Sequence, residues 1–426
     1  MQCYIGLGSN LGDRRANLEA AGRALFAHPD AKPLKAGPVF MTPALLPPNA
    51  PDGWNIPYLN SVLGLNWLGT PQALLAALKN IENMLGRVAA ERWAPRVIDL
   101  DILLFGNDAI AEPNLQIPHY GLYERSFALD PLLHCAPDLS LPNGQLVLSA
   151  ARRLPTHAPL WMGILNLTPD SFSDGGALAT PEQCSERLET YDRAGVQILD
   201  LGAESTRPGA LPLTAGEEWQ RLEPMLRLIK QRYHGQFFRP HLSIDTYRAS
   251  TAEKALALGA DIINDVSGLT DPAMLPLLKN SACDYVLMHS LSIPADRTKV
   301  LEGACDPVAT VRDWALEKLA LLDRQGIALS RVLLDPGIGF GKTPQQSLTL
   351  LQRCQELQDL PVRLLIGHSR KSFMQLWTAA SAANRDDAGM GVSLELCRRG
   401  VDVLRVHAPE RHIAAWLAVA HITQQV

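Results

Sequence analysis

The chain has 426 residues, of which 47% are hydrophobic and 19% charged, and its formal net charge is −5. This composition is that of a folded globular protein and excludes a disordered chain, while the length is too great for a single hydrophobic core. The acidic balance argues against nonspecific binding to nucleic acid, which requires a basic excess.

Seven cysteines are scattered along the chain without a C-x-x-C pair. That pattern favours thiols in a reducing compartment over a disulfide framework or a zinc site. The N-terminal segment lacks the basic and apolar regions of a secretory signal, and no apolar run is long enough to span a bilayer. We therefore expect a cytoplasmic protein without a membrane partner.

The first part of the chain predicts a mixed α+β domain. Strands are expected at 2–7, 34–41, 58–67 and 97–104. Helices are expected at 14–27, 71–85 and 126–135. Thr70 is a suitable N-cap for the second helix because Pro71 follows it at the first helical position. A polar stretch with two prolines then follows, so we predict one domain over 1–153, a linker at 154–159 and a second domain over 160–426.

The second part alternates apolar runs with helical segments. Eight apolar runs end in polar residues, at 164–166, 198–200, 242–245, 262–265, 286–289, 332–335, 364–367 and 403–407. Continuous apolar runs are typical of parallel strands buried on both faces. Eight strand–helix units in roughly 270 residues predict a TIM (β/α)8 barrel. The expected fold class is therefore an α/β multidomain protein, with an α+β domain followed by a barrel.

In such a barrel the active site lies at the carboxyl ends of the strands. Polar or ionisable side chains occupy nearly all of these ends: Asn166, Asp200, Asp245, Asn264, Asp265, His289, Asp335, Ser369, Arg405 and His407. One polar residue at a strand end is usually turn chemistry, but a set that converges on one face indicates a binding site.

Seven segments of the second part fall in order along the barrel strands. They are 166–176 (NLTPDSFSDGG), 200–209 (DLGAESTRPG), 243–246 (SIDT), 263–266 (INDV), 335–342 (DPGIGFGK), 369–372 (SRKS) and 405–407 (RVH). Together they resemble dihydropteroate synthase over essentially the whole of 160–426. The resemblance implies condensation of a dihydropterin methyl pyrophosphate with p-aminobenzoate, release of pyrophosphate, and competition by sulfonamides.

A pterin presents a flat edge of N–H donors and ring acceptors, which carboxylates and amides at fixed positions can recognise. We expect Asp245, Asn264 and Asp335 to bracket that edge, with Lys371 reaching the ring acceptors. Departing pyrophosphate needs cations and hydrogen-bond donors, which are expected from Asn166, Arg405 and His407 with Mg²⁺ at Asn166.

Two Gly- and Pro-bearing segments, 168–176 and 205–212, are expected to close over the site and exclude water. The resemblance implies that Asp170 shapes the first of them. It also implies a p-aminobenzoate pocket formed or ordered by Phe172, Thr206, Arg207, Pro208, Phe340 and Ser369.

Three features of the barrel have simpler interpretations. Asp200 is as consistent with a supporting carboxylate as with direct contact to substrate. His289 is interpreted as a histidine of the barrel rim rather than a catalyst. The run 337–343 (GIGFGKT) imitates a phosphate-binding loop, but its spacing is one residue short.

In the first domain, Asp99 and Asp101 alternate on an expected strand, so both carboxylates face one side. Two carboxylates on one face suit Mg²⁺, and Arg87, Arg92 and Arg96 upstream could clamp phosphates. The alternatives are that Asp99 pairs structurally with Arg96 or Arg92 and that Trp93 belongs to the core.

The segments 8–10 (GSN), 58–60 (YLN), 91–105 (ERWAPRVIDLDILLF) and 117–120 (IPHY) resemble hydroxymethyl-dihydropterin pyrophosphokinase over roughly 1–150. This family has a ferredoxin-like fold and moves pyrophosphate from ATP to the pterin hydroxymethyl group, releasing AMP. The resemblance implies that Asp99 and Asp101 hold Mg²⁺. It implies ATP contacts from Arg87, Arg92, Trp93, Arg96, His119, Tyr120 and Arg125. It implies pterin contacts from Thr42, Pro43, Leu45, Tyr58, Asn60 and Phe127.

Catalytic roles in the two domains are expected for Asp99, Asp101, Arg87, Arg92, Lys371, Arg405 and His407. A bifunctional enzyme is the favoured hypothesis, because the product of the first domain is the substrate of the second. One alternative is an active barrel with a structural or dimer-organising first domain, since Ala89 and Ala90 stand where a basic residue is usual. A pterin-binding methyltransferase barrel is disfavoured by the SRK and RVH segments. The resemblance also implies a homodimer formed through the barrel.

Overall fold

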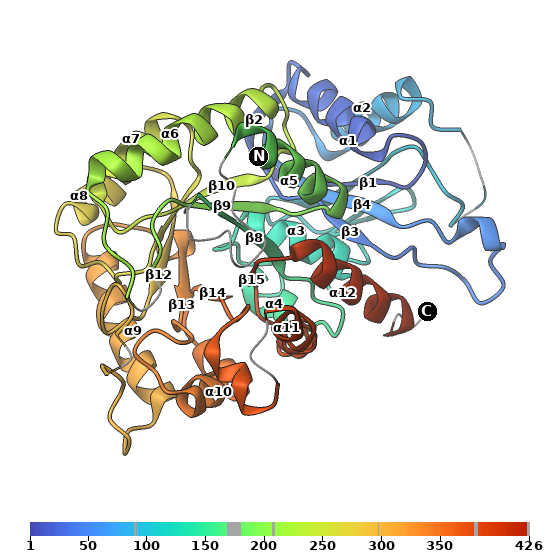
Figure 1. Ribbon diagram of the computed structural model, residues 1–426. Coiled ribbons are helices and arrows are strands. Elements are labelled where there is room, and N and C mark those ends of the chain that lie inside the picture. The colour runs from blue at the N-terminus through green and yellow to red at the C-terminus, as the bar shows by residue number, and fades with distance from the viewer. Residues whose placement is uncertain are drawn as a thin grey trace. The chain divides into compact units, whose positions relative to one another are not determined.

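The computed structural model describes residues 1–88, 91, 93–167, 180–206, 209–296, 298–378 and 382–423. The chain divides into two compact units (Figure 1). The first unit holds residues 1–158, the short segment 235–239 and the chain from Trp416, and the second holds 159–234 and 240–415. The division between Ala158 and Pro159 lies inside the stretch predicted as a linker.

The first unit is built on an antiparallel sheet. Its strands are β1 (Gln2–Ser9), β2 (Ala31–Ala36), β3 (Phe40–Thr42), β4 (Tyr58–Trp67) and β5 (Asp99–Phe105). The order is β2-β4-β1-β5, with β3 also pairing with β4. The expected strand at 34–41 is instead split into β2 and β3. Pro38 lies in the break and has no N–H for a ladder hydrogen bond.

Helices cover both faces of this sheet. They are α1 (Arg14–Phe26), α2 (Pro71–Met84), α3 (Ser126–Cys135) and α4 (Val147–Arg152), with a short turn of 3₁₀ helix at Asp52–Trp54 and a hairpin of β6 (Ile110–Glu112) and β7 (Leu115–Ile117). Alternate residues of β1 face opposite sides, so Cys3, Ile5 and Leu7 join one hydrophobic cluster and Tyr4 the other. Thr70 caps α2 as predicted, accepting a hydrogen bond from the backbone N–H of Ala73.

The segment 235–239 completes the first of these clusters. Phe238 is 3% exposed among side chains of α1, α2 and the sheet. The carboxylate of Glu19 on α1 accepts hydrogen bonds from the backbone N–H groups of Phe237 and Phe238, at 3.0 and 2.8 Å. The hydrophobic core of the first unit therefore includes residues that are distant in sequence from the rest of it.

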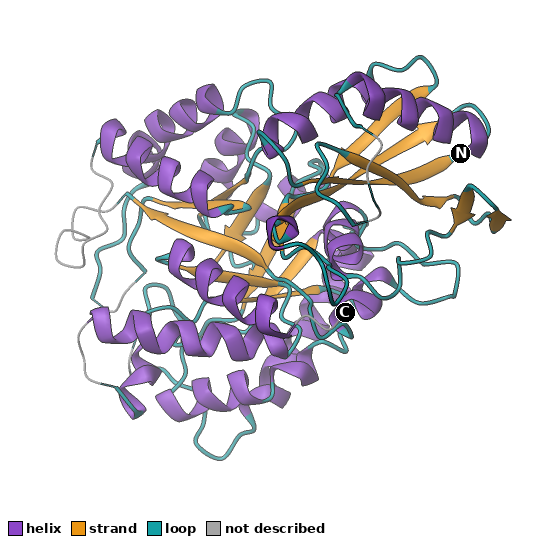
Figure 2. Ribbon diagram, turned by 90° about the vertical axis from the view of Figure 1, so that its right-hand side faces the viewer, coloured by secondary structure: helices purple, strands orange, loops and turns teal. Residues whose placement is uncertain are grey.

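The second unit is a closed barrel of eight parallel strands, which confirms the prediction (Figure 2). The strands are β8 (Leu160–Asn166), β9 (Ile198–Gly202), β10 (His241–Asp245), β11 (Ile262–Asp265), β12 (Asp284–Met288), β13 (Val332–Asp335), β14 (Arg363–Ile366) and β15 (Val403–Val406). The register pairs Gly202 with both Asn166 and Asp245, and Asp245 with Asn264. The polar ends of four neighbouring strands therefore lie at one level.

Helices alternate with these strands. They are α5 (Pro181–Ala194), α6 (Ala215–Arg232), α7 (Ala249–Ala257), α8 (Met274–Lys279), α9 (Pro307–Arg324), α10 (Pro344–Gln352), α11 (Ala382–Arg398) and α12 (Pro409–Thr423), with 3₁₀ turns at Leu329–Arg331, Cys354–Leu357 and Ser372–Leu376. Three of the helices begin with a capping box, at Thr180, Thr214 and Thr343. Within the described ranges, no helix is both long enough and apolar enough to cross a bilayer.

Candidate active sites

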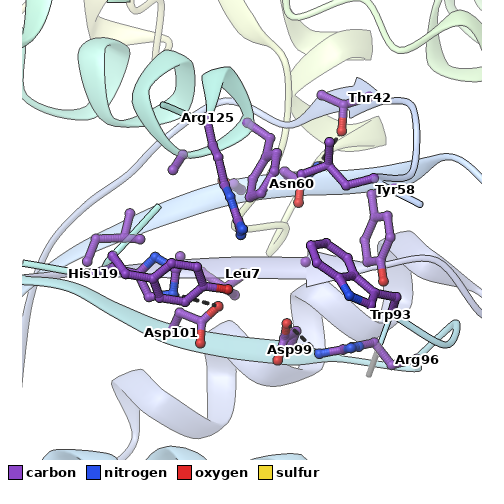
Figure 3. Close-up of a pocket in the computed structure, with 18 of the residues that line it drawn as sticks. Leu7, Thr42, Tyr58, Asn60, Trp93, Arg96, Asp99, Asp101, His119 and Arg125 are labelled. Carbon is purple, nitrogen blue, oxygen red and sulfur yellow. Dashed lines mark hydrogen bonds and ion pairs between the residues drawn. The ribbon is translucent and has the colours of Figure 1, made fainter. Parts of the chain in front are cut away.

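The first unit contains a cavity of about 320 Å³ beside β1, β4 and β5 (Figure 3). Its lining includes every described residue of the first domain that the sequence predicts for contact with ATP, Mg²⁺ or the pterin: Thr42, Pro43, Leu45, Tyr58, Asn60, Arg87, Trp93, Arg96, Asp99, Asp101, His119, Tyr120, Arg125 and Phe127. Arg92 and the pair Ala89 and Ala90 lie outside the described residues. The predicted residues thus line one cavity although they span more than eighty residues of sequence.

One end of the cavity is acidic and flanked by arginines. Arg87 and Arg96 donate hydrogen bonds to the two carboxylate oxygens of Asp99, at 2.5 and 2.9 Å. Asp101, two residues along the same strand, faces the same cavity, as the alternation predicts. Enclosure and the neighbouring carboxylate of Asp99 raise the pKa of Asp101 to about 7. The Asp99 carboxylate opposes the ionisation of Asp101, and a cation between the two carboxylates would offset that repulsion.

Asp99 therefore pairs with Arg96, as the structural alternative proposed, and this pairing lies inside the cavity. Trp93 is partly exposed and lines the cavity, so its interpretation as a core residue is wrong. Its φ of 75° is a conformation that non-glycine residues seldom adopt. Such backbone strain is often held at functional sites.

Glu82 on α2 is a part of this site that the sequence reasoning missed. Its side chain is 2% exposed and accepts hydrogen bonds from the backbone N–H of Leu100 at 2.8 Å and from Lys79 at 2.9 Å. It also forms an ion pair with Arg87. A sequence signal existed, because Glu82 follows Leu74, Leu78 and Ile81 at helical spacing on the buried face of α2.

Aromatic rings also line this cavity, around Arg125. The guanidinium of Arg125 lies 4.8 Å from the ring centre of Tyr120, 5.7 Å from that of Phe127 and 5.9 Å from that of Trp93. Asn60 donates a hydrogen bond to the Thr42 hydroxyl at 2.7 Å. Flat rings together with a side-chain amide held in place by a hydrogen bond suit a planar heterocycle.

At the mouth of the barrel, Arg405 links two carboxylates. Its Nε donates to Asp200 at 2.6 Å, and a terminal nitrogen donates to Asp245 at 2.7 Å. Asp200 is fully buried and also accepts a hydrogen bond from Ser243 at 2.6 Å. The amide of Asn264 approaches it at 3.4 Å. This arrangement matches the supporting interpretation of Asp200, and Ser243 is a contributor that the sequence reasoning did not single out.

The remaining predicted groups of the barrel surround these. Asp335 accepts a hydrogen bond from the backbone N–H of Gly337 at 2.7 Å, and burial raises its pKa. The Lys371 ammonium lies 4.2 Å from the centre of the Phe340 ring. His407 Nδ1 lies 3.0 Å from the Ser369 hydroxyl. These contacts join β13, β14 and β15 at one face of the barrel.

His289 is buried and contacts Lys342, with 2.9 Å between its Nδ1 and the lysine Nζ. Burial lowers the pKa of His289 to about 3, so the ring is neutral at physiological pH. The expected rim position of His289 is consistent with these contacts. Lys342 was not predicted to take part, since the sequence reasoning had only rejected its segment as a phosphate-binding loop.

Part of the expected site lies outside the described residues, namely Asp170, Phe172, Arg207 and Pro208. Thr206 is described, and its carbonyl accepts a hydrogen bond from Ala295 at 3.1 Å. In the described ranges, no group of three or more His, Cys, Asp or Glu side chains could form a metal site on its own.

The barrel with its polar face and the aromatic–acidic cavity define a two-domain enzyme of pterin chemistry. Residues 162–407 match the family described as pterin binding enzyme, and residues 4–137 match 7,8-dihydro-6-hydroxymethylpterin-pyrophosphokinase. The chain is 34% identical to the folate synthesis bifunctional protein of Chlamydia trachomatis, in an alignment that covers 98% of this chain and 97% of that protein.

The barrel part of the chain is also similar to solved structures of dihydropteroate synthases. Xanthomonas albilineans dihydropteroate synthase with 4-aminobenzoic acid is 33% identical and covers 64% of this chain and 95% of that one, with a TM-score of 0.56. Yersinia pestis dihydropteroate synthase in a sulfonamide complex is 31% identical and covers 63% and 95%, with a TM-score of 0.58.

The chain belongs to the bifunctional folate synthesis proteins, with a pyrophosphokinase domain followed by a dihydropteroate synthase barrel. It carries both activities of that family, the pyrophosphokinase activity being ATP-dependent. The expectation of a bifunctional enzyme is confirmed, and the alternatives of a purely structural first domain and a methyltransferase barrel are wrong.

Proposed function

We propose that the cavity of the first unit binds ATP and hydroxymethyl-dihydropterin together, with Mg²⁺ held by Asp99 and Asp101. The observation that carries this proposal is the convergence of two carboxylates, arginines and aromatic rings on one cavity. Mg²⁺ commonly takes one or two protein carboxylates and completes its coordination with phosphate oxygens and water. Two carboxylates without a third ligand are therefore a suitable donor set, and the metal would neutralise charge on the transferred pyrophosphate.

The protein groups in this cavity divide the remaining tasks. Arg87, Arg92 and Arg96 would contact the phosphates, and Trp93, His119, Tyr120 and Arg125 would hold the rest of ATP. The pterin would lie against Tyr58 and Phe127, with the group formed by Thr42, Pro43, Leu45 and Asn60 at its edge. Catalysis in this arrangement consists mainly of positioning and electrostatic stabilisation.

In the barrel, we propose that Asp245, Asn264, Asp335 and Lys371 bind the pterin. Burial raises the pKa of both Asp245 and Asp335, and N–H donors of a bound pterin would offset that effect. Asp200 is proposed to act through Arg405 and Asn264 and not on the substrate itself, because it is fully buried and hydrogen-bonded.

The pyrophosphate is proposed to leave toward Asn166, Arg405 and His407, with Mg²⁺ at Asn166. p-Aminobenzoate would bind beside Phe340 and Ser369, with Thr206, Arg207, Pro208 and Phe172 contributed by the two closing segments. We propose that sulfonamides compete at this position, because related synthases have been solved with 4-aminobenzoic acid and with a sulfonamide drug.

Three further proposals concern the whole chain. The linker is assigned to 154–159 between domains over 1–153 and 160–426, although the segment 235–239 and the chain from Trp416 belong to the first compact unit. A homodimer forms through the barrel, and the protein acts in the cytoplasm. The seven cysteines are all free, which supports a reducing compartment.

A coupled assay on the purified chain tests the site assignments together with their activities. One reaction contains hydroxymethyl-dihydropterin, ATP, Mg²⁺ and p-aminobenzoate, and AMP and dihydropteroate are both quantified. A second replaces ATP with preformed pterin pyrophosphate. Asp101→Asn should abolish product in the first reaction only, whereas Lys371→Met should abolish dihydropteroate in both and leave AMP release intact. Any other distribution of losses contradicts the assignments.

A further inference from the structure

Lys342 follows the glycine-rich turn after β13 and is 6% exposed. Its ammonium nitrogen lies 2.9 Å from His289 Nδ1, 3.2 Å from the His289 carbonyl oxygen and 2.9 Å from the Phe340 carbonyl oxygen. A lysine ammonium has three N–H donors and no acceptor. The three acceptors therefore account for all its hydrogen bonds, and Lys342 has no donor left for a substrate.

His289 forms a fixed partner for this lysine. Its Nδ1 accepts from Lys342, so the ring proton is on Nε2, in agreement with a neutral ring. The ring packs edge-on against Trp314 at 4.9 Å, and the backbone N–H of His289 donates to the Asp335 carbonyl at 3.0 Å. Lys342 is thereby connected to the end of β12 through a residue that is itself held by β13 and α9.

The turn between Asp335 and Lys342 is packed closely against the same residue. Gly337 has a φ of 68°, and a Cβ at this position would overlap the His289 carbonyl oxygen. The backbone N–H of Phe340 donates to the Gly337 carbonyl at 3.0 Å. Lys342 donates hydrogen bonds to both the Phe340 carbonyl and His289. It therefore links the C-terminal end of this turn to the residue that follows β12.

The side chain that this turn carries into the site is Phe340. Its ring is 8% exposed in a small hydrophobic cluster with Val266, Met288 and Ala295. The open side of the ring faces the Lys371 ammonium at 4.2 Å. A displacement of the turn would move the Phe340 ring out of this position.

We propose that Lys342 is a positioning residue for p-aminobenzoate, which holds Phe340 in place through the Phe340 carbonyl and His289. This inference rests on the proposed assignment of Phe340 to the p-aminobenzoate pocket. Among the described residues, the charged and titratable groups that face Lys342 are His289, Asp335 and Lys371. Within the part of the chain that the structure describes, Lys342 donates hydrogen bonds only to His289 and Phe340, neither of which is assigned to pyrophosphate or to the pterin, so we expect its main effect on p-aminobenzoate.

The test uses the full chain with Lys342→Met, which keeps the length of the side chain and removes all three donors. Lys342→Gln retains two donors without charge, and the exposed Lys279→Met is the matched control. KM for p-aminobenzoate, KM for pterin pyrophosphate and kcat are measured separately. AMP release by the first domain of the same molecules reports that the chain is folded.

We expect Lys342→Met to raise KM for p-aminobenzoate between about tenfold and a hundredfold, because small displacements of positioning groups have effects of that order. Lys342→Gln should lie between this variant and the unaltered chain. KM for pterin pyrophosphate and AMP release should stay within about twofold, as they should for Lys279→Met. If both KM values rise together, or if neither changes, Lys342 contributes only to stability and the proposal is overturned.

Phe340→Leu in the same assay tests the assignment of Phe340 to the p-aminobenzoate pocket separately from the positioning role of Lys342. If Phe340→Leu raises KM for p-aminobenzoate and Lys342→Met does not, the pocket assignment stands and the positioning role is refuted. If Phe340→Leu leaves that KM unchanged, the pocket assignment itself fails and the positioning role fails with it. A rise in both variants, without a rise in KM for pterin pyrophosphate, supports the two statements together.

Discussion

Asp99 and Asp101 occupy alternate positions of one strand, yet they have different surroundings. Asp99 is paired with Arg87 and Arg96, whereas the Asp101 carboxylate lies 3.9 Å from Nε2 of His119. The pKa of Asp101 is raised to about 7 by enclosure and by Asp99. We therefore expect the charge of Asp101 to depend on the proposed Mg²⁺.

Replacing Asp101 with Asn should lower pyrophosphokinase turnover by at least about a hundredfold, since a metal ligand contributes several kcal/mol of charge stabilisation. AMP release is the measurement. Dihydropteroate formation from preformed pterin pyrophosphate in the same sample is the control and should be unchanged. Equal losses in both reactions would show a folding defect instead of a lost metal ligand.

The proposed role of Lys342 also predicts a pH dependence. Burial lowers its pKa to about 7, with Asp335 opposing that effect and Lys371 adding to it. The ammonium with three donors is therefore present below about pH 7 and is lost as the pH rises through that value. We expect KM for p-aminobenzoate to rise between about pH 6 and pH 8 in the unaltered chain. Lys342→Met should show a flat profile, and parallel profiles for the two proteins would contradict the assignment.

At the scale of elements, α2 determines the acidic end of the first site. Its Glu82 accepts the backbone N–H of Leu100, which lies between the two aspartates of β5, and also pairs with Arg87. The buried Glu82 carboxylate accepts hydrogen bonds from Leu100, Lys79 and Arg87, and it thereby holds the strand and the arginine in fixed positions. The distance between α2 and β5 is thereby linked to the geometry of the site.

Glu82→Gln keeps an acceptor for Leu100 and removes the charge that pairs with Arg87 and Lys79. We expect a loss of about 1–3 kcal/mol in the free energy of unfolding of the first domain, which is the usual contribution of hydrogen bonds to a buried charged group such as Glu82. This free energy is measured by urea denaturation, with AMP release as the signal for the folded first domain. Glu112→Gln on the exposed hairpin strand β6 is the matched control, and an equal effect of both changes would exclude a specific role of Glu82.

At the scale of the whole molecule, the first unit is discontinuous in sequence. Phe238, which follows α6 in the chain, is buried in the same cluster as Leu18, Leu25 and Leu63. Its backbone is held by Glu19 and Arg15, the latter donating to the Phe238 carbonyl at 2.6 Å. The pyrophosphokinase unit therefore depends for its core on a segment encoded far beyond residue 158.

Phe238→Ala should destabilise the first unit by about 3–5 kcal/mol, as is typical of a buried phenylalanine. The expected observation is loss of AMP release at a lower temperature, measured in a heating series on the full chain. Leu211→Ala, at a side chain 87% exposed, should leave the temperature unchanged. An unchanged temperature for Phe238→Ala would show that the segment is not needed by the first unit.

The sequence by itself predicted an α+β part followed by a barrel of eight strands, and it singled out side chains that the folded chain brings together. It could do so because strand ends in a barrel meet at one face, and because alternation along a strand fixes which side chains share a side. Tertiary structure decided which of these groups pair with one another. Arg405 is bound to Asp200 and Asp245, and Asp99 to Arg87 and Arg96.

Glu82, Lys342 and Phe238 make contacts that the sequence did not predict. Each lies on an element whose local pattern explains its own helix, turn or loop, but each also has a hydrogen-bond partner that is distant in sequence, at 18, 53 and 219 positions respectively. Local periodicity records which face of an element is buried but carries no information about the element packed against it. Contacts of that kind are set by packing and by hydrogen-bond satisfaction in the folded chain, and only the tertiary structure shows them.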